Sequence, residues 1–556
     1  MKKTLWKQCL RIGLMGMLCV SLVACGGDED DGEIILDEAA DTAEAEEGSE
    51  AGRDTLKFIM TAEPDSIDPT LAADSASPYI ISNCFEGLTV MLEDGSVMPG
   101  TAESWEVSED GLVYTFHLRE NAVWSDGKDL TSADFVYAWK RLLSPEVAAD
   151  YEWFMGPYVL NGDKFFAEEC NFDEVGIKAP DGDTIVVTLE HPCDYFLELC
   201  ATPAYSPVRE DIVEGNPSWS TNPETYITNG PFCISQIAIG EGITLVKNDH
   251  YWDADNVALS SVEYDFVADV TTALQAYEKG EVDGMDKVPG TEYSRLKLED
   301  DGFQARDKIQ TIFLNYNVTD PVLSDVRIRK ALSLAIDRDA IVNEINNGVG
   351  KPAYDLVAPG ISVDGQDFRE YVGESDYASM TYEERCDEAR KLLAEAGYPD
   401  GNGFPELEFQ DYNSKLPTAI IKMWEDQLGI STITLNTVEW KVHIAEMKKL
   451  DIQIARGGWT ADFLSPTSFL SMYIANSGNN YTGWKDSEYD ALIAKAETES
   501  GTQAMDDFAI AEEVFMDAQP IIPLYYNEFT FLMNNHLKGW YMTANGYLSL
   551  KGAYFE

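Results

Sequence analysis

Residues 102–145 read AESWEVSEDGLVYTFHLRENAVWSDGKDLTSADFVYAWKRLLSP, and they contain both kinds of regular structure from which the fold is built. Over residues 112–119 large apolar side chains alternate with polar or smaller ones, which is typical of a half-buried strand. After a short turn, Thr131 and Asp134 have the spacing of a helix capping box, and apolar residues recur at helical spacing over residues 135–142. A strand followed directly by an amphipathic helix predicts a mixed α/β fold.

The sequence on either side of this stretch continues the mixture. We expect strands at 183–192, 242–252, 259–269 and 451–459, a helix at 271–283, and two helices within 314–348 with N-caps Asp325 and Asp337. Strands and helices do not alternate strictly, which indicates several α/β lobes instead of one doubly wound sheet. A chain of 556 residues is long enough for two or three hydrophobic cores.

The composition restricts the possible partners. The chain has 99 acidic and 39 basic residues, which gives a formal charge of −60, and its 45% hydrophobic content fits a packed globular protein. Because such an acidic surface repels a phosphate backbone, we expect no nucleic-acid partner. The acidity also keeps the protein soluble.

The N-terminus predicts export. A basic start, MKKTLWKQCLR, is followed by the short apolar run IGLMGMLCVSLVA and by Cys25. The LVAC sequence resembles the lipobox of bacterial lipoproteins, and this implies a signal peptide at 1–24 and a lipid on the Cys25 sulfur. An ordinary signal peptide and a membrane anchor stay open as alternatives. Residues 25–53 are so acidic and so poor in apolar residues that we expect an extended, disordered tether.

Sequence signatures of enzymes and metal sites are absent. The chain contains no GxSxG, HExxH, GxxxxGK[ST] or Rossmann glycine pattern, no CxxC pair, and only five histidines, none at ligand spacing. Cys193 and Cys200 would lie roughly 10 Å apart on a helix, too far for a disulfide, so we expect free thiols. We therefore expect a binding protein without catalytic residues, cofactor or metal. An exported hydrolase with paired carboxylates is the disfavoured alternative.

Five segments together carry a resemblance to a known family. They are the opening stretch at 102–145, TNGPFCISQIAIGEGITLVKNDHYWD at 228–253, DVRIRKALSLAIDRDAIV at 325–342, RGGWTADFLSPTSFL at 456–470 and PIIPLYY at 520–526. With these segments the chain resembles the oligopeptide-binding proteins of ABC importers, which are extracytoplasmic solute-binding proteins of the peptide/nickel class (family 5). The resemblance extends from about residue 54 to residue 556.

The resemblance implies a two-lobed clamp of the periplasmic-binding-protein type (type II, cluster C). The first lobe would comprise residues 54–89, 206–310 and 520–556, the inserted domain residues 90–205, and the second lobe residues 311–519. The crossovers near residues 310 and 520 would form a hinge. The expected protein is a monomer on the extracytoplasmic face of the bacterial cell membrane, lipid-anchored, that delivers an oligopeptide to the permease subunits of an ABC transporter.

The resemblance also implies the residues of the site. Asp462 would hold the ammonium group of an extended peptide and Arg456 its carboxylate, while the backbone of Gly458, Trp459 and Thr460 would pair with the ligand like an added strand. The opposite edge of the peptide would meet residues of the first lobe, and aromatic residues would line the side-chain pockets. These further residues are Ala73, Asp74 and Ser75 for the edge, and Tyr151, Trp440 and Trp484 for the pockets.

Several alternatives remain open at this point. The same fold could bind a nickel chelate, an oligosaccharide or an opine, and a peptide receptor for signalling would have the same binding chemistry. Asp462 favours a ligand with a free amine, since a sugar needs no anion. Pro417 stands about where some relatives carry a histidine that serves a longer peptide, so the preferred peptide length stays open.

Overall fold

The computed structural model describes residues 52–363, 365–413 and 415–556. The signal peptide, Cys25 and all but the last two residues of the tether lie outside the described residues. Within the described part, no helix has both the length and the apolar character needed to span a membrane. The mixed α/β character predicted from the sequence is confirmed.

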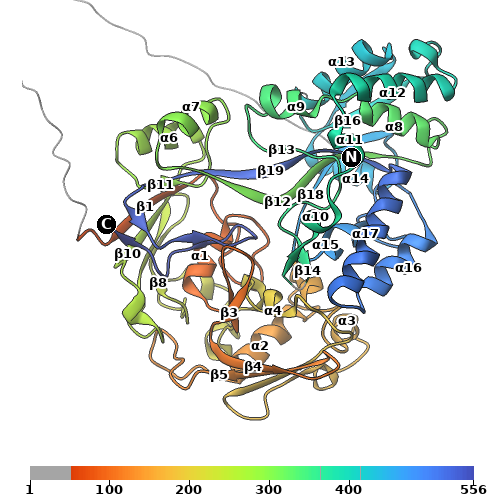
Figure 1. Ribbon diagram of the computed structural model, residues 1–556. Coiled ribbons are helices and arrows are strands. Elements are labelled where there is room, and N and C mark those ends of the chain that lie inside the picture. Colours follow the sequence, from red (N-terminus) through yellow and green to blue (C-terminus); the bar gives the residue numbers. More distant parts are fainter. Residues whose placement is uncertain (1–51, 364, 414) are drawn as a thin grey trace, which may run out of the picture. The chain divides into compact units, whose positions relative to one another are not determined.

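One sheet of 11 strands runs through the described part of the chain (Figure 1). Its hydrogen-bonded path is β17 (Ile433–Thr437), β16 (Leu407–Asp411), β18 (Ile454–Thr460), β12 (Phe303–Tyr316), β19 (Ile521–Met533), β11 (Gly284–Met285), β1 (Thr55–Met60), β10 (Ser261–Phe266), β9 (Gly242–Lys247) and β8 (Phe232–Ala238). β13 (Lys351–Pro352) pairs with β19 outside this path.

The two long strands β12 and β19 join the halves of this sheet. They pair with each other in antiparallel fashion over most of their length, with a register shift between Asp307 and Thr311. β12 pairs with β18 of the second lobe over residues 310–316, and β19 pairs with β11 of the first lobe at Leu532 and Met533. Figure 1 shows the pair passing from one half to the other. This arrangement fits a hinge near residues 310 and 520, although the domain boundaries themselves stay a prediction.

Helices pack on the outer parts of the sheet and form separate cores. The second lobe has one core with α8 (Val326–Leu334), α12 (Tyr382–Glu395) and α13 (Lys415–Leu428), and another with α16 (Ser487–Ala496) and α17 (Gly501–Ala518). The first lobe contributes α1 (Ser77–Cys84), α6 (Val270–Glu278) and α7 (Tyr293–Glu299). The Asp325 and Asp337 side chains accept backbone N–H groups at their helix starts, as the sequence predicted.

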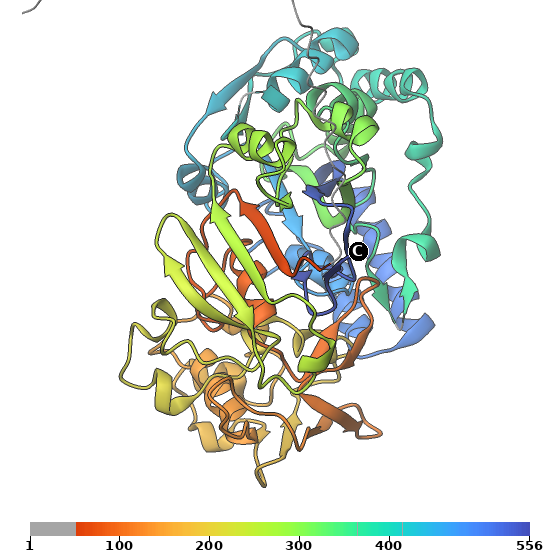
Figure 2. The ribbon, with the colours of Figure 1, turned by 90° about the vertical axis from the view of Figure 1, so that its left-hand side faces the viewer.

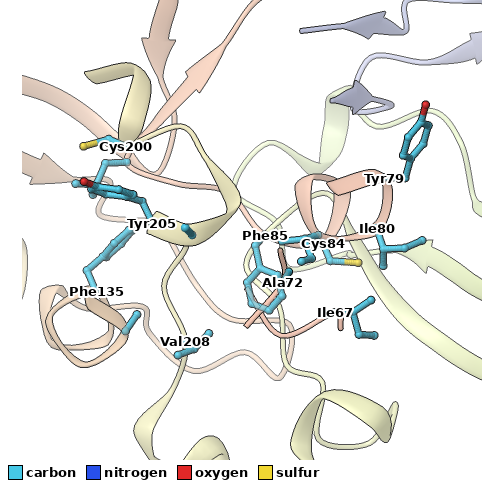
Figure 3. Packing of buried hydrophobic residues seen from close by; sticks show 14 of the residues in the cluster. Ile67, Ala72, Tyr79, Ile80, Cys84, Phe85, Phe135, Cys200, Tyr205 and Val208 are labelled. Atoms are coloured by element: carbon cyan, nitrogen blue, oxygen red, sulfur yellow. The ribbon is translucent and has the colours of Figure 1, made fainter. Parts of the chain in front are cut away.

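Residues 90–205, the predicted inserted domain, contain a separate four-stranded sheet and share a core with the predicted first lobe. Its strands are β4 (Ala102–Val107), β5 (Val113–Leu118), β7 (Thr184–Thr188) and β6 (Ile177–Lys178), and α2 (Ser132–Leu142) carries the predicted capping box. Phe135 and Tyr205 belong to the same buried cluster as Phe85 and Ile80 of the first lobe (Figure 3). In both ribbon views residues 90–205, orange to yellow, lie together at one end (Figure 2).

The segment 193–200 is less helical than its sequence suggested. Only Phe196–Leu199 form α4, and the Cys193 carbonyl before it accepts both the Phe196 N–H and the Tyr114 hydroxyl at 3.2 Å. Cys193 and Cys200 are both buried free thiols, which confirms the prediction that they form no disulfide.

Candidate functional site

The edge of β18 that faces away from β12 is open over its second half. β18 pairs with β12 over its whole length, from Ile454 to Thr460, but within the described residues it pairs with β16 only at Ile454 and Ala455. The Ala461 N–H donates to the Ile309 carbonyl on β12 at 2.8 Å. Because successive residues of a strand direct their N–H and C=O groups to opposite sides, those of Gly458 and Thr460 face the open edge. This edge can therefore accept an added strand.

Two glycines allow β18 to lie close to β12. A Cβ atom on Gly457 would lie 2.5 Å from the Asn315 amide nitrogen and 2.8 Å from the Phe313 ring. On Gly458 it would lie 2.7 Å from Ile312 Cδ1. A side chain at either position would have to displace the neighbouring side chains of β12, so the glycine pair fits the packing on this strand.

Asp462 follows the open edge and lies partly buried, and among residues 52–363, 365–413 and 415–556 its carboxylate has no positive partner. Its backbone N–H donates to Ser468 Oγ at 2.9 Å, but its carboxylate has no salt bridge or hydrogen bond within the described residues. Burial raises the pKa of the Asp462 carboxyl to about 7. A buried carboxylate without a counter-charge is costly, and the pKa is raised for that reason. The arrangement is suited to a ligand that brings its own cation.

The surroundings of Asp462 come from both lobes. Burial, followed by the charges of Asp462 and Asp74, raises the pKa of the Tyr151 hydroxyl. Burial, followed by the charges of Tyr151 and Asp462, likewise raises the pKa of the Tyr547 hydroxyl. Three residues expected from the sequence, Asp462, Asp74 and Tyr151, are therefore brought together. Tyr547, from the C-terminal segment of the first lobe, was missed because nothing in its local sequence distinguishes it from a core tyrosine.

Arg456 has a protein partner. Its Nε lies 2.9 Å from Asp411 Oδ2, and its guanidinium lies over the Tyr412 ring at 4.1 Å from the ring centre. Burial raises the pKa of Asp411, and the Arg456 charge opposes this rise. Within the described residues, Arg456 contacts the Asp411 carboxylate through Nε and the Tyr412 ring through the face of its guanidinium. The terminal nitrogens would be the atoms left for a ligand carboxylate.

The Ala73–Ser75 segment has one engaged side chain between two exposed residues. The Asp74 carboxylate accepts the backbone N–H groups of Ala76 at 2.7 Å and Ser77 at 2.9 Å, and so holds the start of α1. Ala73 and Ser75 are exposed. Asp74 thus fixes the shape of the segment, and the backbone on either side of it is accessible.

The expected aromatic residues differ in exposure. Trp440, at the start of α14 (Trp440–Met447), is 53% exposed and meets Tyr412 edge to face at 4.8 Å. Trp484 is only 8% exposed and packs against Tyr489 and Phe515 in a core of the second lobe, a position that favours packing over ligand contact. Trp459 is partly buried, and its indole N–H has no partner within the described residues.

Two further groups near β18 were missed by the sequence reasoning. His443 Nε2 lies 2.8 Å from the Arg456 carbonyl oxygen, so the carbonyl group at the start of the open edge already has a hydrogen-bond partner. Lys308 lies on β12 two residues before Gln310, the partner of Thr460, and burial lowers the pKa of its ammonium. No local pattern identifies either residue, because both depend on the pairing of distant strands.

Comparison with known proteins gives consistent matches over nearly the whole chain. The model of the bacterial extracellular solute-binding proteins, family 5, matches residues 96–481. The dipeptide-binding protein DppE of Bacillus subtilis is 33% identical, with 99% of each chain covered. The oligopeptide-binding protein OppA of the same organism is also 33% identical, over 91% of this chain and 93% of the relative. A solved substrate-binding domain of an oligopeptide ABC transporter from Bacillus anthracis superimposes with a TM-score of 0.72 at 29% identity, over 91% of this chain and 99% of the other.

Proposed function

The chain belongs to the bacterial extracellular solute-binding proteins of family 5, which have a two-lobed α/β fold, and from this we propose that it captures oligopeptides outside the membrane and delivers them to an ABC permease. Relatives with 33% identity are named for dipeptide and oligopeptide binding, which supports a peptide ligand. The family is one of binding proteins, so no catalytic step is proposed.

The observation that carries this proposal is the carboxylate of Asp462. It lies partly buried, without a counter-charge within the described residues, directly after a strand edge that is open for pairing. The α-ammonium group of a peptide would supply the missing charge, and the peptide backbone would supply the missing strand partner. A sugar or an uncharged solute would satisfy only part of this arrangement.

The rest of the proposed site follows from the same orientation. The ligand backbone would pair with Gly458 and Thr460 on the second lobe, and its other edge would face Ala73 and Ser75 on the first lobe. Contacts to both lobes at once would shift the protein toward its closed form. Since backbone pairing does not depend on the side chains of the ligand, selectivity for peptide sequence would be weak.

The carboxylate end of the peptide has one favoured partner. Arg456 would hold it through the guanidinium nitrogens that Asp411 does not engage. Six extended residues span at most about 20 Å and a tripeptide about 10 Å, so the flexible arginine side chain can bridge the difference.

The proposal includes the attachment and the domain plan. The protein would be a monomer anchored through a lipid on Cys25, at the extracytoplasmic face of the cell membrane, with residues 25–53 as tether. The first lobe, the inserted domain and the second lobe would have the boundaries given above. The continuous pair β12 and β19 supports a hinge between the lobes.

Calorimetry with trialanine and with N-acetyl-trialanine tests the proposal. We expect the free peptide to bind and the acetylated peptide, which lacks the ammonium group, to bind at least tenfold more weakly. Equal binding of both would refute the role of Asp462. Native mass spectrometry of protein purified from cells would then identify the ligand that co-purifies, and a nickel chelate, opine or oligosaccharide there would replace the peptide proposal.

A further inference from the structure

Phe463, the residue after Asp462, lies outside the cores of its own lobe. It is 5% exposed and belongs to the large cluster formed by the first lobe and the inserted domain. Among the described residues of 311–519, it is the one member of that cluster. Its ring stacks on Tyr195 with 4.1 Å between ring centres and 3° between planes, and meets Tyr158 edge on at 6.2 Å.

Leu464 is held by the inserted domain as well. Its backbone N–H donates to Glu198 Oε2 at 3.1 Å. A Cβ atom on Gly95, in the turn between β2 (Thr89–Met91) and β3 (Val97–Pro99), would lie 2.5 Å from Leu464 Cδ1. Gly95 has a φ of +84°, so glycine suits both the turn and the close approach. In the reverse direction, Met91 reaches into a core of the second lobe.

These contacts cross between the lobes away from the hinge strands. The inserted domain shares a continuous core with the first lobe (Figure 3), so the two are expected to move together. A cavity of about 160 Å³ adjoins the contact and is lined by Tyr195 and Glu198 on one side and Leu464 and Phe508 on the other. A movement of the second lobe away from the inserted domain would withdraw the Phe463 ring from its contacts with Tyr195 and Tyr158.

We propose that packing of the Phe463 ring against Tyr195 and Tyr158 holds the second lobe against the inserted domain. We call this contact the latch, Phe463 its plug, and the two tyrosines its socket. The latch would couple binding of the ammonium group at the adjacent Asp462 to closure of the two lobes. The peptide part of this inference rests on the proposed function. Tyr195 and Tyr158 form the socket, and Glu198 fixes the backbone that carries the plug. Because the plug and the ammonium-binding carboxylate are consecutive, displacing one displaces the other.

The latch predicts a specific change in binding kinetics. Phe463→Leu shortens the plug and removes the stacking, so the closed form becomes less populated and a bound peptide escapes faster. We expect trialanine to dissociate at least tenfold faster, with an association rate within about threefold of wild type, since interface changes act mainly on dissociation. Tyr195→Leu removes the socket from the other side and has the same effect, whereas Tyr195→Phe keeps the ring and restores slow dissociation.

The control is Phe469→Leu. Phe469 is a fully buried ring in the core of the second lobe that Met91 and Leu464 also reach, so this variant lowers stability while the Phe463 and Tyr195 rings stay unchanged. Small-angle scattering of the ligand-free proteins gives a readout that needs no peptide. We expect a larger radius of gyration for Phe463→Leu and Tyr195→Leu, and an unchanged one for Phe469→Leu and Tyr195→Phe.

The outcomes separate the latch from the peptide proposal. If wild type does not bind trialanine but the two latch variants expand, the latch stands and the peptide ligand is wrong. If wild type binds trialanine and the latch variants match Phe469→Leu in both radius of gyration and dissociation rate, the latch is wrong. Should Phe463→Leu fail to fold, Tyr195→Leu alone decides between these results.

Discussion

The protonation of Asp462 gives the sharpest test of how this protein binds its ligand. Burial raises the pKa of this carboxyl from 3.8 to about 7 in the ligand-free protein. A peptide ammonium beside it would favour the ionised form and lower that pKa in the complex. Below pH 7 the carboxyl must therefore lose a proton before the ammonium group can pair with it.

The size of the effect follows from this pKa. At about pH 7 roughly half of free Asp462 is ionised and at pH 5 roughly one molecule in a hundred, so peptide affinity should fall about fiftyfold, or about 2.3 kcal/mol, between these two pH values. Above about pH 8 the α-amino group of the peptide itself loses its proton, and affinity falls again. We expect the highest affinity between about pH 7 and pH 8.

Asp462→Asn removes the charge and keeps the shape of the side chain. Removing one side of a buried charge pair typically costs about 2–5 kcal/mol, which is roughly thirty-fold to several-thousand-fold in affinity. The variant should also lose the fall in affinity between pH 7 and pH 5. Acetylated trialanine should already bind weakly to wild type and lose little more in the variant.

Calorimetry with free and acetylated trialanine on both proteins forms a double-mutant cycle. Running it at pH 5, 6 and 7 in buffers of different ionisation enthalpy also counts the protons released on binding. If the affinity losses from acetylation and from Asp462→Asn are additive, or if wild-type affinity is the same at pH 5 and pH 7, Asp462 does not bind the ammonium group.

Four further predictions use other features of the chain. Folding raises the pKa of the Asp462 carboxyl from 3.8 to about 7, so its contribution to stability is fully present below about pH 4 and is lost as pH rises toward 7; the melting temperature of Asp462→Asn without ligand should therefore exceed that of wild type at pH 8, by less at pH 5, and not at pH 3. Arg456→Lys cannot reproduce both the Nε bond to Asp411 and the stacking on the ring, so free tripeptides should bind about tenfold more weakly while amidated ones lose less, and equal losses would mean a structural role only. Gly458→Val should lower the melting temperature and weaken trialanine binding, since its side chain would have to displace Ile312 beside the open edge, and a variant that binds normally would contradict strand addition at this edge. Cys25→Ser should move the protein from the membrane fraction to the medium, and continued membrane attachment would indicate another anchor.

The features that the sequence could predict are those decided by near neighbours. The capping box of Thr131 and Asp134 lies within one helical turn, and residues of this type at this spacing have few alternatives. The N-caps Asp325 and Asp337 were predictable for the same reason. The mixed α/β class follows from adding such local segments together.

The features that the sequence could not predict depend on residues that lie far apart along the chain. Arg456 meets Asp411 across 45 positions of chain, and only the pairing of β16 with β18 brings them together. Trp484 and Trp440 look alike as tryptophans near polar sequence, yet one lies in a core and the other is largely exposed. That Asp462 has no counter-charge in the described part of the chain depends on all the segments that surround it, so no local motif could show it.

The order of groups along residues 458–464 explains how a weakly selective site can still hold its ligand. The open edge at Gly458 and Thr460 binds any extended backbone, Asp462 requires a free ammonium group, and Phe463 and Leu464 contact the inserted domain. Since the raised pKa of Asp462 makes the ionised, ligand-free site unfavourable, an ammonium group gains most when the surrounding lobes exclude water. Recognition and closure would then depend on the same short segment, and ligand side chains would need to contribute little to either.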